Sequence, residues 1–315
     1  YRNPGTYNTA PTSKSYPQDY NQGSSVNANA KKQNYFASLN STATTGMSQI
    51  AEPNENVTYE ADRFSRINYL GKIGYKVTDK LTLDFFGNYD KIDNDYDGGF
   101  DNTGTNDVVQ NHSKSEQFRV GFLPKYKYEN GEFVLNSSLN KILRSYDEFD
   151  SYSNTVGFSK YESRSVNVDA YNKYEFSKSL FLVAGAEYQF HDMNSETPYG
   201  GVAKESAKFN MIDPYLTGVY TSDFGLNVNA GARLNIHSEY GNQLVYNLNP
   251  SFDFKAFPLK VLASYSTAFV TPSLYQLYSP YGNTALTKEK NTTVEAGFET
   301  NLLDDKVLFK SDGMP

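Results

Sequence analysis

The feature that most constrains the fold is a regular alternation of apolar and polar residues over long stretches. Residues 180–191 and 81–90 have this period of two, and so do residues 226–237. In 226–237 the apolar positions are Leu226, Val228, Ala230, Ala232, Leu234 and Ile236. Successive side chains of a β-strand point to opposite faces, so each stretch predicts a strand with one apolar and one polar face.

Short turn signals and long polar stretches separate the predicted strands. Tight turns are predicted near residues 79, 130, 178, 223, 258 and 304, and long loops at 96–113, 148–157, 193–207 and 271–290. Strands of soluble β-sandwiches have about five or six residues, whereas these are about twice as long. Long strands with short turns at one end and long loops at the other are typical of outer-membrane β-barrels. A long-stranded soluble fibre or solenoid is the alternative, but no short repeat is present.

Composition excludes several other classes of protein. The net charge of -7 argues against nucleic acid as a partner, because phosphate contacts need clustered Lys and Arg. Without cysteine the chain has no disulfides and no thiolate metal site. No apolar run approaches the ~18 residues of a transmembrane helix. Common enzyme motifs are absent, and the sequence therefore predicts a protein that is not an enzyme.

The stretch SYSTAFVTPSLYQLYSPYGNTALTKEKNTTVEAGFE, residues 264–299, carries a more specific signal. It resembles a strand-loop-strand segment of the TonB-dependent outer-membrane transporters. Matching residues include Ser264, Tyr265, Thr267, Pro272, Leu274, Gln276, Leu277, Tyr278, Gly282, Asn283, Leu286, Glu289, Lys290, Glu295, Gly297 and Glu299. The chain departs from the family pattern at Val270, where the family has a basic residue, and at Thr284 and Lys288, where it has prolines.

This resemblance implies an all-β fold, a transmembrane antiparallel β-barrel. Residues 1–315 are expected to form a portion of one such barrel domain, because both ends of the sequence look cut. We expect a partial barrel of about 14 of the family's roughly 22 strands, without the N-terminal plug and the last strands. The plug would carry the contact with TonB.

Within the family, the cobalamin transporter branch is the nearest likeness, through residues 281–290 and 214–220 and the Asp-rich loop described next. The resemblance implies an active transporter for a scarce nutrient, cobalamin or another corrinoid, in the outer membrane of a Gram-negative bacterium. Outer-membrane lipid and lipopolysaccharide are its expected surroundings. A siderophore (iron-chelate) or haem receptor of the same family is one alternative. A passive porin or a surface adhesin is another.

The Asp-rich loop predicts a calcium site. Asp93, Asp95, Asp97 and Asp101 are spaced like the first ligands of a D-x-D-x-D-G calcium loop, but the last ligand position holds Gly104. Hard carboxylate oxygens suit Ca²⁺. Calcium orders extracellular loops in cobalamin transporters, and the resemblance adds two residues of a neighbouring hairpin tip, which are Asp147 and Asp150. A solvated acidic loop is the alternative.

The tyrosine-rich segment after residue 270 predicts the ligand contacts. Most of the 27 tyrosines are expected in the aromatic girdles of the barrel. A tyrosine in a loop offers a broad flat surface and one hydroxyl to a ligand. The residues predicted to contact the ligand are Tyr275, Gln276, Tyr278, Tyr281 and Asn283.

Overall fold

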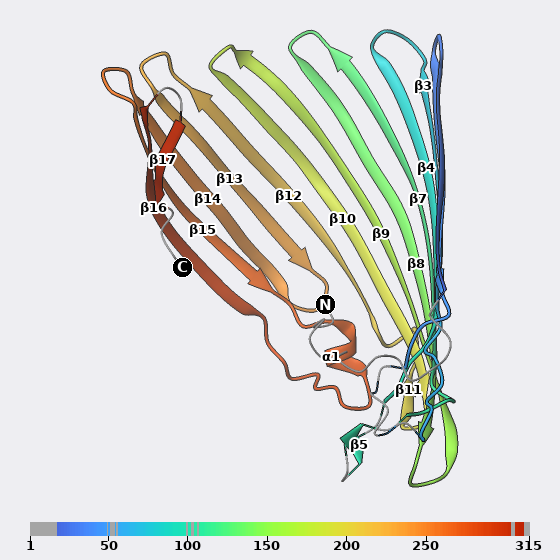
Figure 1. Ribbon diagram of the computed structural model, residues 1–315. Helices are drawn as coiled ribbons and strands as arrows, with labels where there is room; N and C mark the ends of the chain where they lie inside the picture. Colours follow the sequence, from blue (N-terminus) through green and yellow to red (C-terminus); the bar gives the residue numbers. More distant parts are fainter. Residues whose placement is uncertain are drawn as a thin grey trace.

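The structure is a computed structural model that describes residues 18–48, 50, 54, 56–98, 100–101, 104–105, 107–303 and 306–311. Its main feature is one antiparallel sheet in which each strand pairs with its neighbours along the chain (Figure 1). The path through the sheet contains 14 strands, as the sequence predicts. None of the described helices is long and apolar enough to cross a membrane.

The strands are long, from 12 to 23 residues in most of the sheet. The first half consists of β1 (Asp19–Ala30), β2 (Gln33–Thr44), β3 (Phe64–Lys76), β4 (Leu81–Asp95), β7 (His112–Tyr128), β8 (Gly131–Asp150) and β9 (Thr155–Ser177). The second half consists of β10 (Leu180–Thr197), β12 (Lys208–Thr221), β13 (Leu226–His237), β14 (Gly241–Phe254), β15 (Leu259–Val270), β16 (Glu289–Leu303) and β17 (Lys306–Ser311). The short elements are β5 (Phe100–Asp101), β6 (Gly104–Thr105), β11 (Gly200–Val202) and α1 (Leu274–Tyr278).

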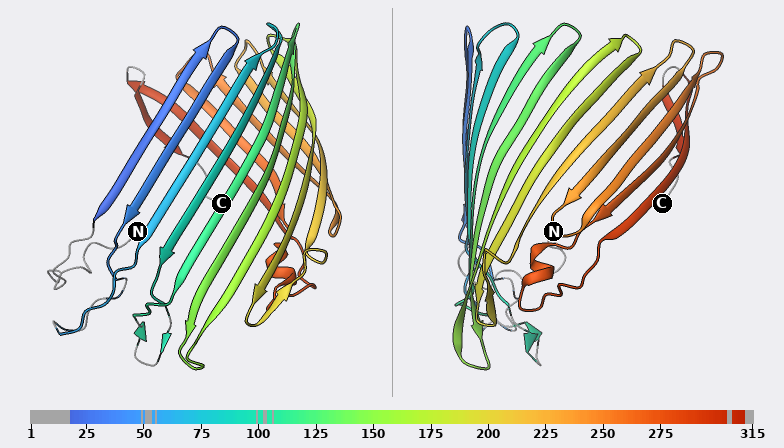
Figure 2. Two further views of the ribbon diagram at one scale, coloured as in Figure 1. Left: turned by 90° about the vertical axis from the view of Figure 1, so that its right-hand side faces the viewer. Right: turned by 180° about the vertical axis from the view of Figure 1, so that it is seen from behind.

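The sheet curves like the wall of an incomplete barrel (Figure 2). Tight turns join the strands at one end, at the top of Figure 1, and the longer connections with α1, β5 and β11 gather at the other end. We call these the turn end and the loop end. Among the described residues no hydrogen bonds join β1 to β17, so the described sheet is open.

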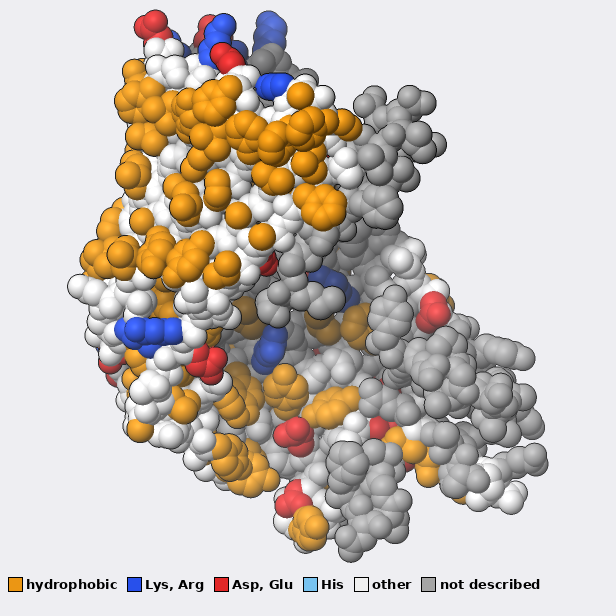
Figure 3. All heavy atoms as spheres, turned by 90° about the vertical axis from the view of Figure 1, so that its left-hand side faces the viewer, with side chains coloured by type: hydrophobic (Ala, Val, Ile, Leu, Met, Phe, Trp, Pro, Cys, Tyr) orange, Lys and Arg blue, Asp and Glu red, His pale blue; other side chains and the backbone are white. Residues whose placement is uncertain are grey.

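The two faces of the sheet differ as the alternation predicts. Directly paired residues share a face, and the register places Leu216 opposite Ala232 and Leu182 opposite Gly218 on the convex outer face. Large apolar side chains on this face are exposed, among them Leu216 at 51%. Figure 3 shows hydrophobic side chains gathered in two bands across part of the outer wall, with charged side chains beyond them. A wall of this kind is suited to hydrocarbon.

Polar contacts across β9, β10, β12 and β13 hold this part of the inner face together. Arg233 on β13 donates to Glu187 on β10 at 2.6 Å and lies 3.6 Å from Asp213 on β12. Asp213 is only 1% exposed, and Tyr215, whose ring lies under the guanidinium of Arg233, donates its hydroxyl hydrogen to Asp169. This part of the inner wall is therefore a network of paired polar groups, not an apolar core.

The predicted tight turns near residues 79, 130, 178, 223 and 258 are present, and the turn near 304 lies outside the described residues. The turn between β12 and β13 requires a glycine at position 225. Its φ is +108°, and a Cβ there would lie 2.1 Å from the carbonyl oxygen of Asp253. Only glycine fits this position without strain.

Two of the predicted loops are mostly strand. Residues 148–157 contain the ends of β8 and β9, separated only by 151–154, and residues 193–207 contain the end of β10 and all of β11. Beyond the apolar belt both faces of a strand meet water, so the alternation is lost while the hydrogen-bonded ladder continues. Polarity alone therefore does not distinguish such a hairpin from a loop.

Candidate functional site

Helix α1 is held on the inner side of the loop end by a capping box and two apolar anchors. Ser273 is the N-cap and accepts a hydrogen bond from the backbone N–H of Gln276, whose side chain accepts one from Ser273 in return. Leu274 and Leu277 are buried. Leu274 belongs to an apolar cluster with Met193, Val202 and Ala207.

Other contacts fix the segment that follows α1. The hydroxyl of Tyr240, in the β13–β14 turn, donates to the carbonyl of Leu286 at 3.2 Å, and Lys288 Nζ donates to the carbonyl of Tyr240. The ring of Tyr281 lies 6.3 Å from that of Tyr199, near the tip of the β10–β11 hairpin. Residues 271–288 therefore form an ordered cover that rests on two neighbouring connections.

We expect Leu274→Ala to loosen this cover. Truncating a buried leucine leaves a cavity and costs about 2 kcal/mol or more. Hydrogen exchange of residues 274–288 in the full-length protein should become faster, while exchange in β12 and β13 stays unchanged. Leu286→Ala is the matched control, because it removes the same atoms from the same segment at a residue that is 37% exposed. Equal exchange in the two variants would contradict the anchoring role of Leu274.

A cavity of about 560 Å³ lies on the inner face beside α1. Its walls come from β8, β9, β10 and α1, and three tyrosines form an aromatic surface in it. The ring of Tyr161 lies 6.0 Å from Tyr146 and 6.1 Å from Tyr275. The lining residues are Ile142, Arg144, Tyr146, Glu148, Tyr161, Glu162, Ser163, Met193 and Tyr275.

Arg144 is the distinctive charge in this cavity. It makes no ion pair or hydrogen bond with any residue of the described part of the chain. The two carboxylates in the lining are engaged, because Glu162 pairs with Lys141 at 2.8 Å and Glu148 accepts from the hydroxyl of Tyr96 at 3.3 Å. Burial and the neighbouring Glu148 carboxylate raise the pKa of Tyr96, so that hydroxyl remains a donor. A guanidinium without a counterion beside tyrosine rings suits an anionic ligand with flat aromatic groups.

Of the five residues predicted to contact the ligand, the structure places one, Tyr275, in the cavity. The side chain of Gln276 accepts from the backbone N–H of Ser273 in the capping box, and the side chain of Asn283 accepts from the backbone N–H of Ala285. Tyr278 packs against the apolar cluster under α1, and Tyr281 is 75% exposed beside Tyr199. Their contact with a ligand remains a prediction.

The wall residues contributed by β8 and β9 are not among the predicted site residues. Ile142, Arg144, Tyr146 and Glu148 are alternate residues of β8, so period two places all four on one face. This alternation is the signal in the sequence from which a shared face could have been predicted. It does not by itself reveal which face is the inner one, or that Tyr161 and Met193 lie beside them.

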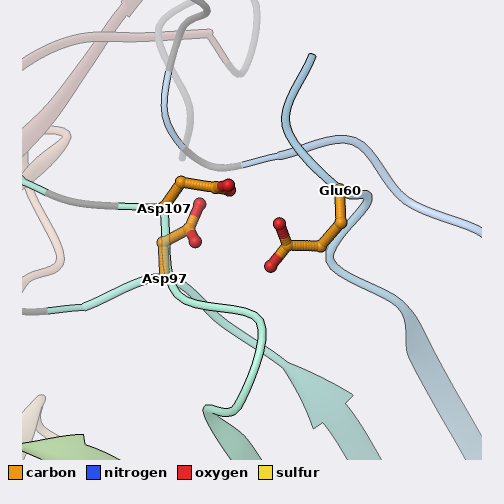
Figure 4. Close-up of side chains that lie close together, drawn as sticks. All are labelled: Glu60, Asp97 and Asp107. Carbon is orange, nitrogen blue, oxygen red and sulfur yellow. The ribbon is translucent and has the colours of Figure 1, made fainter. Parts of the chain in front are cut away.

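A group of three carboxylates lies at the loop end, outside the paired strands. Carboxylate oxygens of Glu60, Asp97 and Asp107 all lie within 4.8 Å of one another and point toward a common centre (Figure 4). The backbone N–H of Val108 donates to Asp97 at 2.9 Å. Burial and the nearby Glu60 and Asp97 raise the pKa of Asp107 to about 7. The donor set is all oxygen and could hold a calcium ion.

Among the predicted calcium ligands whose side chains the structure describes, only Asp97 joins this group. Asp95 accepts from Arg63 and lies 2.8 Å from a ring nitrogen of His112, while Asp93 lies 3.4 Å from the other ring nitrogen. Asp147 is on β8, where it pairs in register with His112. Asp150 accepts from Ser153 and from the backbone of Tyr152 at the β8–β9 turn, and these bonds hold its pKa below the usual value. The side chain of Asp101 lies outside the described residues.

Glu60 and Asp107 are the cluster members that the sequence did not reveal. Asp107 lies beyond the predicted 12-residue loop, and Glu60 approaches from the segment before β3. The spacing of aspartates along the chain predicts neither residue. The segment before β3 and the connection after β4 come together because β3 pairs with β4.

The comparisons with known proteins agree with this architecture. The sequence profile of a family described as "TonB dependent receptor-like, beta-barrel" matches residues 1–313. A solved structure of a variant of the ferric enterobactin receptor PfeA from Pseudomonas aeruginosa has a TM-score of 0.70 and 16% identity, covering 90% of this chain and 48% of that one. The siderophore receptor PirA from Acinetobacter baumannii has a TM-score of 0.68 and 14% identity, with coverage of 90% and 48%.

The copper transporter OprC is similar as well, with a TM-score of 0.69 and 11% identity over 90% of this chain and 50% of that one. This chain spans about half the length of each of these structures. At such identities, the likeness to these three structures shows the fold alone.

Proposed function

The chain belongs to the TonB-dependent receptor β-barrel family, and from this membership we propose that the full-length protein is an outer-membrane receptor for active uptake of a metal chelate. Capture at the loop end would be followed by uptake energised through TonB. The family match favours this function over a passive porin, a surface adhesin or an enzyme. Its location would be the outer membrane of a Gram-negative bacterium.

We propose an anionic, aromatic iron chelate as the first candidate substrate. The unpaired Arg144 among three tyrosines carries this proposal, because a guanidinium and aromatic rings together suit catecholate or carboxylate groups around a metal. The cavity volume of about 560 Å³ lies within the range of small-molecule sites. Two of the similar structures are named as a ferric enterobactin receptor and a siderophore receptor, which agrees with this chemistry.

Cobalamin is the second candidate substrate. The likeness of residues 281–290, residues 214–220 and the Asp-rich loop to cobalamin transporters supports it. Cobalamin presents amide groups and little negative charge, so it offers no obvious partner to Arg144. Haem is the remaining alternative, and its propionates could pair with this guanidinium.

A titration of the full-length, detergent-purified protein separates these candidates. Quenching of the intrinsic fluorescence of the protein reports binding. A ferric tris-catecholate should bind more tightly than cyanocobalamin or haemin. Tighter binding of cyanocobalamin would reverse the order of the candidates. If none of the three binds, the chelate proposal fails.

We also propose that calcium binds to Asp97 together with Glu60 and Asp107, and orders the connections at the loop end. Three carboxylates converge there, and burial together with the neighbouring Glu60 and Asp97 raises the pKa of Asp107 to about 7. Asp93 and Asp95 are excluded from this proposed set, because His112 and Arg63 already occupy their carboxylates. Calcium would supply positive charge that joins the segment before β3 to the β4–β7 connection.

Calcium should raise the thermal unfolding midpoint of the full-length protein, and a chelator should reverse the rise. Asp97→Asn is expected to weaken calcium binding by about tenfold or more, because affinity follows the number of charged ligands. Asp147→Asn is the matched control, since this acid also belongs to the predicted calcium set but lies outside the cluster. A larger effect of Asp147→Asn would favour the set of aspartates predicted from the sequence.

A further inference from the structure

The cavity beside α1 brings phenol oxygens together as well as aromatic rings. Tyr161, at the loop end of β9, lies at the centre, with the ring of Tyr146 packed edge-on against it and that of Tyr275 tilted toward it. The hydroxyls of Tyr161 and Tyr275 are neighbours, and burial together with this neighbour raises the pKa of Tyr161. The phenol of Tyr161 therefore keeps its proton unless a cation displaces it.

A carboxylate adds its oxygens to this group of phenols. Glu148 lies in the same lining, close enough for its negative charge to act on Tyr161. The hydroxyl of Tyr96 donates to Oε1 of Glu148 at 3.3 Å, which helps to orient the carboxylate. Within the described part of the chain Glu148 forms no ion pair, so its negative charge is available to a ligand.

The spacing and the charge of these oxygens suit a trivalent metal ion. Metal–oxygen bonds of about 2 Å at right angles place two adjacent ligands of an octahedral ion about 3 Å apart. Hydroxyls that are hydrogen-bonding neighbours, as those of Tyr161 and Tyr275 are, have a similar separation. Two phenolates and the carboxylate of Glu148 together carry three negative charges, which match the charge of a ferric ion, and tyrosine is a known protein ligand of iron.

Arg144 restricts the form in which the iron arrives. Its guanidinium has no partner in the described residues and would repel a bare ferric ion. It favours a complex whose chelator is an anion, because the chelator's carboxylates can pair with the guanidinium. The tyrosines can reach the iron only if that chelator leaves coordination positions open. A tris-catecholate fills the whole octahedron and leaves none.

We propose that this cavity coordinates ferric iron directly, taking it as the complex of a carboxylate chelator that leaves two or three coordination positions open. Tyr161 and Tyr275 each lose a proton and bind the iron as phenolates, and Glu148 fills a third position where one is open. Arg144 pairs with the chelator. The protons leave to water, since Tyr275 is 44% exposed, and the iron remains ferric. The inference rests on the proposed function as a chelate receptor and names a further class of chelate for the same cavity.

Visible absorption of the full-length, detergent-purified protein tests the inference. The probe is ferric nitrilotriacetate, a carboxylate chelate with two open coordination positions. A phenolate bound to ferric iron gives a visible charge-transfer band that neither the chelate nor the protein has alone. The wild type should develop this band and release protons as it binds the probe. Binding of the probe without the band would overturn the proposal, because the iron would then lie outside the reach of the tyrosines.

The double variant Tyr161→Phe with Tyr275→Phe retains both rings and removes both ligand oxygens. It should lose the band and bind ferric nitrilotriacetate about tenfold or more weakly, since even residues that only support metal ligands have effects of this size. Tyr199→Phe with Tyr281→Phe is the matched control, because these two rings also lie beside each other but outside the cavity. The control should retain the band. A band of wild-type intensity in the cavity variant, or an equal loss in the control, would overturn the proposal.

Titration of the same preparations with a ferric tris-catecholate separates this inference from the proposed function. Its iron is already saturated, so its binding depends on Arg144 and on the aromatic rings, which the phenylalanine variant retains. Unchanged catecholate affinity in that variant also shows that the cavity is intact. Catecholate binding by the wild type without a band on ferric nitrilotriacetate would remove only the direct coordination. A band without catecholate binding would support the coordination and remove the first candidate substrate.

Discussion

Replacing Arg144 with glutamate is expected to abolish high-affinity binding of an anionic chelate. The guanidinium is the cation of the cavity without a partner in the described residues, and the variant would place a carboxylate beside Glu148. A hydrogen bond to a charged group contributes about 1.5–3 kcal/mol, so the loss of the charge alone should weaken binding roughly 10- to 150-fold. Charge reversal adds repulsion to this loss. Fluorescence titration of the full-length protein with a ferric tris-catecholate measures the change.

Arg119→Glu is the matched control for this experiment. Arg119 lies on the inner face of the neighbouring strand β7, is exposed, and does not line the cavity. Its replacement changes the charge of the inner wall equally but should shift chelate affinity by less than about threefold, because water screens the separated charge. An equal loss in both variants would assign the effect to the general field of the wall. Undiminished binding by Arg144→Glu would remove the cavity from the proposed function.

Replacing Arg233 with alanine is expected to cause a large loss of stability. Asp213 is 1% exposed and Glu187 accepts at 2.6 Å, so the variant leaves two carboxylates on the inner wall without their shared cation. Removing one partner of a buried ion pair costs about 3–5 kcal/mol. Because Arg233 is 36% exposed at its side chain, we expect the lower end, about 3 kcal/mol. Urea unfolding in micelles, followed by circular dichroism, measures the change.

Neutralising the stranded acids should restore stability. Adding Asp213→Asn and Glu187→Gln to Arg233→Ala removes the uncompensated charge and should recover most of the lost free energy. Arg119→Ala, an arginine of the inner face without an ion pair in the described residues, should change stability by less than about 0.5 kcal/mol. If Arg233→Ala unfolds at the same urea concentration as the wild type, the polar network contributes little to the fold.

The fold was predictable because period two is a local property. A sheet that separates hydrocarbon from a polar interior needs one apolar face on each strand. Residues 226–237 meet this need with an apolar residue at every second position. The turns near 130 and 223 were predictable for a similar reason, since Asn130 and Gly225 adopt positive φ angles that few residues tolerate. The hairpin of β8 and β9 was not predictable, because strands that meet water on both faces have no required pattern.

The candidate site depends on contacts between strands, and a local pattern does not encode these. Tyr275 could be predicted from its loop. Arg144 becomes a candidate site residue only because Tyr161 and Met193 of the next strands line the same cavity. In the same way, the spacing of the aspartates predicted Asp97 as a metal ligand. Glu60 and Asp107 come from other segments and could not be predicted from that spacing.

The sequence by itself determined the class of sheet, the alternation of two faces along most strands, and the family. The tertiary structure alone decided which charges are paired and which remain free. Pairing depends on the register of neighbouring strands, and a shift of one residue would move Arg233 away from Glu187 and Arg144 out of the cavity.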